Sequence, residues 1–311
     1  MSVSADGARA AIAPAIAIAM AWFATGCGAT SGADADAGTR AESDGGVTSS
    51  EDAGPSFGGT ATSCTDATRL VYLIAKDGTL LSFAPATLAF KTVGTLRCGV
   101  DAASLPFSMS VDRGGAAWIL YDSGQLATAS LADASCTLTP FARDQSGFRT
   151  FGMGFSSDAR EGSDETLFVV DYLGKGLARI DRKSLALAEI APFAGDLSGK
   201  AAELAGTGDG RLFGLFRLAP SARLVELDKR TGHAISDEPL AGVLAGSDFA
   251  FSFWGGDFYF FTVDVKANPG ATSRLTRYRP SDKSVTVLSE QIGFIVVGAG
   301  VSTCAPTVPI R

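Results

Sequence analysis

The sequence predicts an all-β fold, a five-bladed β-propeller built from four-stranded antiparallel blades. The first observation behind this prediction is a set of strand-like segments that recurs five times at intervals of about 46 to 51 residues. The second is that apolar runs such as Leu167–Val170 are continuous, which indicates strands covered on both faces. The third is that Gly- and Asp-containing turns interrupt the chain every few residues. They leave no room for the amphipathic helices that a parallel sheet requires.

The third strand of each repeat opens with an apolar residue and carries a second one three positions later. These pairs are Leu80/Phe83, Leu126/Ala129, Leu177/Ile180, Leu224/Leu227 and Leu275/Tyr278. A second strand precedes each pair, at Val71–Ile74, Ala116–Leu120, Thr166–Val170, Arg211–Leu215 and Phe258–Thr262. Five matches at one spacing indicate the blades of a propeller.

The first strands of the repeats predict how the ring closes. The candidates are Ser108–Val111, Gly152–Phe155, Glu203–Gly206, Ala250–Phe253 and Ile295–Gly298. No further strands of a repeat follow Ile295–Gly298, and no first strand precedes Val71–Ile74. We therefore expect Ile295–Gly298 to pair with Val71–Ile74 and to complete the first blade from both ends of the chain, which removes two exposed sheet edges.

The chain divides into three predicted parts: residues 1–27, 28–63 and 64–311. Residues 1–27 are typical of an export signal, because Arg9 precedes the apolar run Ala10–Phe23, which is too short to span a bilayer. Ala24-Thr25-Gly26-Cys27 resembles a bacterial lipobox, with Ala24 where Leu is usual. This resemblance implies diacylglycerol on Cys27 and an anchor in the cell envelope, and Gly28 favours the outer membrane. The alternative is an ordinary signal whose cleavage releases the protein.

Residues 28–63 are predicted to form a disordered tether. The segment consists mainly of Gly, Ala, Ser, Thr and Asp, and it cannot bury enough surface to offset its ordering entropy. Its six acids and one base account for most of the formal net charge of −7. The remainder has no basic face, and we therefore expect no nucleic-acid partner.

Four cysteines remain after Cys27, and in an exported protein they suggest two disulfides. Cys64 lies just before the strand Val71–Ile74, and Cys304 lies just after the strand Ile295–Gly298. Because the closed ring pairs these two strands, we predict the disulfide Cys64–Cys304. Cys98–Cys136 then follows by elimination, although the two cysteines are predicted to lie toward opposite ends of their strands. The cysteine spacings include no paired Cys-x-x-Cys motifs, and we therefore do not expect a zinc site.

The catalytic candidates are few. His233 is the only histidine and lies in a predicted turn. Any Ser-His-Asp triad or Cys-His pair would have to use it. Glu203 is a candidate channel carboxylate of the kind that propeller glycosidases use as acid or base. The alternative is that Glu203 has only a structural role at the solvent-exposed start of a strand. A lactonase-type metal site is disfavoured because Asn268 is the only asparagine. We expect no cofactor and no metal.

The ligand-binding candidates are aromatic. Phe148, in the loop 142–150, is predicted to be exposed. Trp254, near Phe258 and Tyr259, is either a sugar platform or core packing. The loops 142–150 and 264–273 should lie on one face, where a rigid scaffold usually presents its binding residues.

Four segments resemble propeller-type lipoproteins abundant in myxobacteria. They are Pro106–Asp112, Thr150–Phe155, Phe253–Tyr259 and Val297–Cys304. This resemblance implies the fold and an envelope location, and no activity. We therefore expect a lipid-anchored, monomeric propeller that acts as a non-catalytic module binding an envelope protein or a glycan. The alternative is an envelope hydrolase, related to glycosidases or lactonases.

Overall fold

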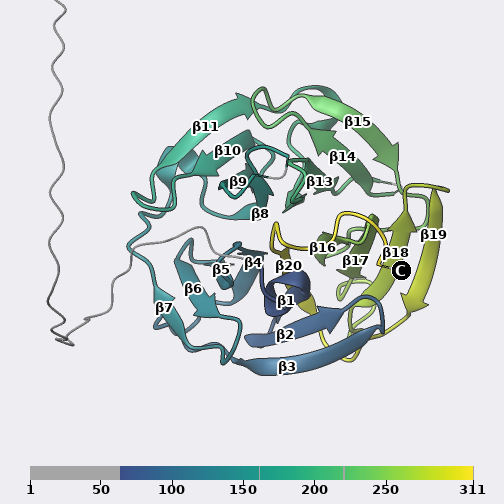
Figure 1. The fold of residues 1–311 in the computed structure, drawn as a ribbon, viewed down its shortest axis with the longest axis horizontal. Coiled ribbons are helices and arrows are strands. Elements are labelled where there is room, and N and C mark those ends of the chain that lie inside the picture. The colour runs from purple at the N-terminus through teal and green to yellow at the C-terminus, as the bar shows by residue number, and fades with distance from the viewer. Residues whose placement is uncertain (1–63, 161, 220, 311) are drawn as a thin grey trace, which may run out of the picture. The chain divides into compact units, whose positions relative to one another are not determined.

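The computed structural model describes residues 64–160, 162–219 and 221–310. The predicted signal, the predicted lipidation site Cys27 and the predicted tether 28–63 lie outside these residues. Within them, the chain forms five four-stranded antiparallel sheets arranged as the blades of a ring, which confirms the predicted fold (Figure 1). β4, β8, β16 and β20 lie nearest the centre, and β3, β7, β11, β15 and β19 lie at the periphery.

The blades have these bounds. Blade 1 contains β20 (Val296–Val301), β1 (Val71–Ala75), β2 (Thr79–Ala84) and β3 (Ala89–Thr95). Blade 2 contains β4 (Pro106–Val111), β5 (Ala116–Tyr121), β6 (Leu126–Ser130) and β7 (Cys136–Leu138). Blade 3 contains β8 (Phe151–Ser157), β9 (Glu165–Asp171), β10 (Gly176–Ile180) and β11 (Leu187–Pro192). Blade 4 contains β12 (Ala202–Gly206), β13 (Leu212–Phe216), β14 (Arg223–Leu227) and β15 (Ala234–Pro239). Blade 5 contains β16 (Asp248–Trp254), β17 (Asp257–Val263), β18 (Arg274–Arg279) and β19 (Ser284–Ser289). Three 3-10 turns occur at Ala67–Arg69, Gln145–Gly147 and Gly195–Leu197.

The C-terminal strand closes the ring as predicted. β20 pairs antiparallel with β1, with Ile74 opposite Gly298 and Val71 opposite Val301. β20 begins one residue later than expected and extends to Val301, so the pairing covers the whole length of β1. The yellow β20 beside the dark blue β1 shows this join (Figure 1).

Glycines let the inner strands approach one another at the centre. A Cβ atom on Gly298 would lie 2.6 Å from the backbone nitrogen of Met109, and one on Gly300 would lie 2.8 Å from the carbonyl carbon of Ser110. Backbone therefore packs on backbone where the neighbouring inner strands β20 and β4 meet.

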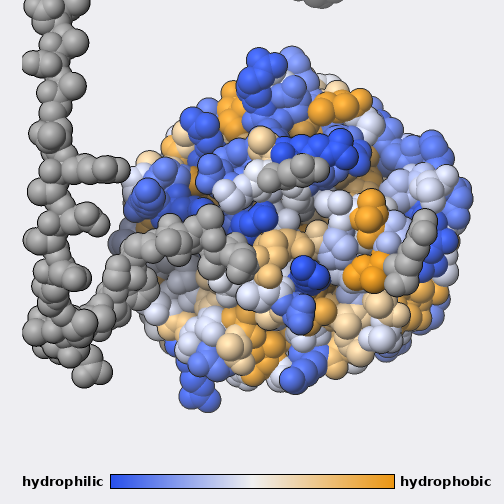
Figure 2. Space-filling view, in the orientation of Figure 1, coloured by the Kyte–Doolittle hydropathy of each residue, from blue (hydrophilic) through white to orange (hydrophobic). Residues whose placement is uncertain are grey.

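Apolar side chains fill the spaces between neighbouring blades. Phe83 of blade 1 meets Phe261 of blade 5 edge to face, with ring centroids 5.8 Å apart. Trp118 of blade 2 meets Phe155 of blade 3 in the same way at 6.0 Å. The peripheral strands are more exposed to solvent; β15, for example, is mostly exposed. On the face shown in Figure 2, hydrophobic residues form small groups among hydrophilic ones.

Both disulfides expected from the sequence are present. Cys64 and Cys304 are bonded across the seam of blade 1 with their Cα atoms 5.4 Å apart. Cys98 and Cys136 are bonded with their Cα atoms 4.9 Å apart. They can meet because Cys98 lies beyond β3, in the segment that crosses to blade 2, and β7 is short.

Candidate functional site at the mouth of the ring

One face of the propeller carries the crossings between blades and the turns between second and third strands. At this face, the residue that follows the second strand occupies the same place in four blades. These residues are Lys76, Asp122, Tyr172 and Arg217, which we call the mouth ring. The backbone N–H of each donates to the carbonyl just before the adjacent inner strand, that of Ile295, Leu105, Thr150 and Ala201, at 2.8, 3.0, 3.0 and 2.8 Å. The sheet register therefore fixes the positions of these four backbones.

A cavity of about 200 Å³ opens at the centre of this face, and all five blades contribute to its wall. Its lining residues are Lys76, Leu105, Pro106, Phe107, Asp122, Tyr172, Glu203, Ser247, Asp248, Phe249 and Val297. A pocket with a few convergent polar groups is the usual form of a ligand site. We call it the mouth cavity.

Glu203 reaches this cavity from β12 and is nearly inaccessible to solvent, at 4% exposure. Ser108 Oγ donates to Glu203 Oε2 at 2.7 Å. Burial raises the pKa of Glu203 well above its usual value, and the hydrogen bonds from Ser108 and from the Met153 backbone oppose this effect only in part. Burial therefore favours the neutral carboxylic acid, a form that can donate as well as accept a hydrogen bond.

An ion pair lies beside this acid. Lys76 Nζ is 2.9 Å from Asp248 Oδ1, and Ser247 Oγ donates to Asp248 Oδ2 at 2.9 Å. Lys76 and Asp248 are 172 positions apart in the sequence, and ring closure brings their blades together. The pair supplies one cation and one anion, so its net charge is zero.

Tyr172 is the aromatic member of the mouth ring. Its ring meets Phe107 edge to face at 4.9 Å and stacks near Phe249 at 6.5 Å, while the Arg217 guanidinium lies over it at 5.6 Å. Burial raises the pKa of Tyr172, and the positive charge of Arg217 acts in the opposite direction. The hydroxyl is therefore protonated at neutral pH, and it accepts a hydrogen bond from Arg217 at 3.3 Å.

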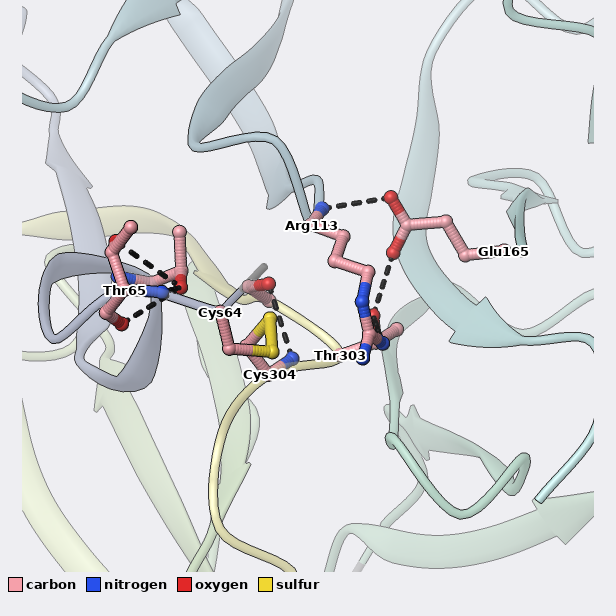
Figure 3. Close-up of a disulfide and its surroundings, with 8 residues drawn as sticks. Cys64, Thr65, Arg113, Glu165, Thr303 and Cys304 are labelled. Atoms are coloured by element: carbon pink, nitrogen blue, oxygen red, sulfur yellow. Dashed lines mark hydrogen bonds between the residues drawn. A yellow bond between two sulfur atoms is a disulfide. The ribbon is translucent and has the colours of Figure 1, made fainter. Parts of the chain in front are cut away.

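A second buried acid, Glu165, lies near the disulfide Cys64–Cys304 (Figure 3). It accepts hydrogen bonds from the Arg113 backbone N–H at 2.7 Å and from Thr303 Oγ1 at 2.8 Å. Burial raises its pKa, and these bonds and the Arg182 charge oppose the effect. Glu165 connects blade 3 to blade 2 and to the chain after β20, and all its partners are structural.

The structure separates the three candidate residues. Glu203 lies in the mouth cavity. The prediction that Phe148 is exposed is wrong, because its side chain is 1% exposed and packs with Trp118, Phe141 and Phe151 between blades 2 and 3. Trp254 is also buried, and its indole N–H donates to the Arg69 carbonyl at 2.7 Å. Of its two alternatives, core packing is the one observed.

Three structural findings bear on the other expectations. Among residues 64–310, omitting 161 and 220, no group of three or more His, Cys, Asp or Glu is arranged to hold a metal ion. His233 is exposed in its turn. In the same part of the chain, no helix has the length and apolar character needed to cross a membrane.

Sequence reasoning did not identify the mouth ring or Asp248. The signal for the ring was present, because each of its members lies two residues beyond the end of a predicted second strand. The Lys76–Asp248 pair had no such signal, since only the closed ring brings these distant positions together.

No protein-family profile matches the chain, and no curated protein is significantly similar to it. Solved structures of similar fold include the extracellular domain of a proposed one-component system from B. thetaiotaomicron. It is 14% identical over 71% of this chain, with a TM-score of 0.39, and the match covers 28% of that protein. A protein of unknown function from Bacteroides caccae is 12% identical over 75% of this chain and 98% of its own, with a TM-score of 0.42. A nidogen/laminin complex gives 12% identity over 74% of this chain and 97% of the other, with a TM-score of 0.41. At these values nothing about function transfers to this chain.

Proposed function

We propose that this protein is an exported, lipid-anchored binding module of the bacterial cell envelope, monomeric and non-catalytic, and that it binds its ligand at the mouth cavity. The observation that carries the proposal is the convergence of side chains from all five blades on one cavity, with Glu203, Tyr172 and the Lys76–Asp248 pair supplying its polar groups. A propeller is rigid because each blade is packed between two others, so such a site is pre-organised.

Separate observations support the proposed cellular location of the protein. Two disulfides are typical of proteins that leave the reducing cytosol. The lipobox-like segment ending at Cys27 and the resemblance to myxobacterial propeller lipoproteins support a lipid anchor, in the outer membrane by the sorting residue Gly28. Globomycin should make the precursor accumulate, and Cys27→Ser should move the protein from membranes to the soluble fraction. Membrane association unchanged in the Ser variant would contradict the anchor.

The binding site can be tested with two probe panels, synthetic peptides and soluble neutral oligosaccharides, titrated against the full chain. Lys76→Met should weaken binding of any probe that occupies the mouth cavity by at least about tenfold, because it removes a donor from the cavity wall and leaves Asp248 unpaired. The matched control is Lys283→Met, since Lys283 also pairs with a carboxylate, Glu238, at 2.9 Å but lies outside the cavity. Equal effects of the two variants, or no binding from either panel, would overturn the proposal.

A hydrolase of the glycosidase or lactonase type is the second candidate, and one observation favours it. Burial raises the pKa of Glu203 well above its usual value, which favours the protonated form that a general acid needs, and the carboxylate side chain of Asp248 lines the same cavity. Turnover of an oligosaccharide or lactone that Glu203→Gln abolishes would favour the enzyme over the binding module.

A further inference from the structure

Arg217 stands at the rim of the mouth cavity and is held there by aromatic rings. Its guanidinium lies 5.6 Å from the ring centroid of Tyr172 and 5.9 Å from that of Phe249. Both rings line the mouth cavity, and Arg217 itself is exposed. Stacking of a guanidinium on aromatic faces is attractive and needs no carboxylate. The rings therefore present a charged group to solvent beside the opening of the cavity.

Only one nitrogen of this guanidinium donates to the protein. Nη1 donates to the Tyr172 hydroxyl and to the Gly246 carbonyl, each at 3.3 Å, which is longer than a strong hydrogen bond. Within the part of the chain that the structure describes, Nε–H and Nη2–H of Arg217 have no acceptor, and no carboxylate forms an ion pair with this residue. We call these two donors the fork of Arg217.

Two other arginines of blade 4 show what such a fork binds within this protein. Arg211 directs Nε and Nη2 to the two carboxylate oxygens of Glu226, at 2.8 and 2.7 Å. Arg223 directs the same two nitrogens to the two oxygens of Asp237. This parallel pairing is the preferred geometry between an arginine and a carboxylate or a phosphate. The fork of Arg217 has the same donors, and it is exposed at the mouth instead of being paired within its blade.

The acidic side chains around the mouth are engaged elsewhere. Asp248 pairs with Lys76 at 2.9 Å, and burial favours the neutral form of Glu203. Asp264 Oδ1 accepts two backbone N–H groups of its own turn, at 3.1 and 3.2 Å. Asp122 also lines the mouth cavity, but it belongs to blade 2, and blade 3 lies between blade 2 and blade 4. An anion on the fork is therefore not opposed by an adjacent free carboxylate of these four residues.

A second cation lies close to Arg217. Lys200 immediately precedes Ala201, whose carbonyl accepts the backbone N–H of Arg217 at 2.8 Å. Lys200 is exposed, and none of the ion pairs among the described residues includes it. Two cations that have no acidic partner in the described chain therefore lie at the same end of blade 4. Their combined field attracts an anionic ligand toward this side of the mouth.

We propose that the ligand bound at the mouth carries an oxyanion, a carboxylate or a phosphate group, and that this group docks on the fork of Arg217. Two oxygens of the group each accept one N–H of the fork, and the rest of the ligand lies in the mouth cavity beside Tyr172. This inference rests on the proposed function, because it names the chemical group by which the same site recognises its ligand.

The first experiment observes the fork directly, by nuclear magnetic resonance of the full chain labelled with nitrogen-15. The protein is titrated with inorganic phosphate and, separately, with acetate, at an ionic strength held constant with chloride. The Nε–H resonance of Arg217, identified by its loss in Arg217→Lys, should shift and saturate with at least one of these anions. Those of Arg211 and Arg223 should stay in place, because a carboxylate already occupies them. An Arg217 resonance that moves with neither anion would overturn the inference.

The second experiment compares matched probes that differ only in the anion. Peptides ending in a free carboxylate are paired with the same peptides ending in an amide, and phosphorylated oligosaccharides with their neutral parents. In at least one panel the anionic member should bind about tenfold or more tightly, as a charge-assisted pair of hydrogen bonds predicts. Arg217→Gln should remove this advantage. Arg179→Gln is the control, because Arg179 is also exposed but lies on β10, away from the mouth cavity. Both positions are exposed, and the variants are therefore expected to fold.

The outcomes distinguish the two proposals. Equal binding of anionic and neutral members, weakened in both by Lys76→Met, would overturn the anion inference and leave the proposed function standing. An anion advantage that Arg179→Gln reduces as much as Arg217→Gln would also overturn the inference, because it would reflect overall charge. Failure of every probe to bind would overturn the proposed function itself.

Discussion

The disulfide Cys64–Cys304 should stabilise the protein more than the second disulfide does. The two bonds differ in the length of chain that they close, 240 residues against 38. If a crosslink acts mainly on the entropy of the unfolded chain, these lengths correspond to about 5.5 and about 3.9 kcal/mol. The double variant Cys64→Ser/Cys304→Ser should therefore lose about 1.6 kcal/mol more free energy of unfolding than Cys98→Ser/Cys136→Ser.

Guanidinium chloride unfolding of the two double variants, followed by tryptophan fluorescence under identical conditions, measures this difference. Both variants replace two cysteines with serines, so each serves as the control for the other. A seam variant that loses no more stability than the Cys98/Cys136 variant would refute the reasoning. It would mean that the strand pairing of β20 with β1, and not the covalent bond, sets the cost of opening the ring.

Three further predictions follow from the packing and from the pKa shifts. Gly298→Ala should cost more than about 2 kcal/mol in the free energy of unfolding, because its Cβ would lie 2.6 Å from the Met109 nitrogen. Gly78→Ala should cost only about 1 kcal/mol in the free energy of unfolding, because a Cβ atom there meets open space and only the φ of +85° disfavours it. Equal losses of stability in the two variants would contradict the close approach of Gly298 to Met109. The raised pKa of Glu203 means that the folded protein favours the neutral acid, so wild-type stability falls as pH rises from the unfolded pKa toward the folded one. Glu203→Gln escapes this loss, and its stability relative to wild type should increase by up to about 1.4 kcal/mol per pH unit above pH 5; a pH-independent difference would show that Glu203 is not held neutral. Trp254→Phe removes the hydrogen bond to the Arg69 carbonyl and should lower stability by about 1 to 3 kcal/mol while leaving ligand affinity unchanged; lost affinity in a folded variant would restore Trp254 as a binding residue.

Most of the fold was predictable because it rests on a repeat. The apolar anchors such as Leu126 and Leu177 begin or nearly begin the third strands β6 and β10. The two incomplete repeats at the ends of the propeller predicted the pairing of β20 with β1.

The candidate site was less predictable, because it depends on how side chains turn once the strands are placed. Phe148 lies in a polar loop, yet its ring is buried among Trp118 and Phe151, where it packs between two blades. Loop position indicates where the backbone runs and says little about the direction of one large apolar side chain. Lys76 and Asp248 meet only through the closed ring, and no local pattern could have paired them.

Ring closure is the central claim, because it brings all five blades to one mouth. Hydrogen exchange of the backbone amides tests it most directly. If β20 is an inner strand, the amides of Val296–Val301 should exchange as slowly as those of the inner strand β12, since both are fully buried and paired. Exchange in β20 as fast as in the exposed peripheral strand β15 would contradict closure and, with it, the mouth cavity.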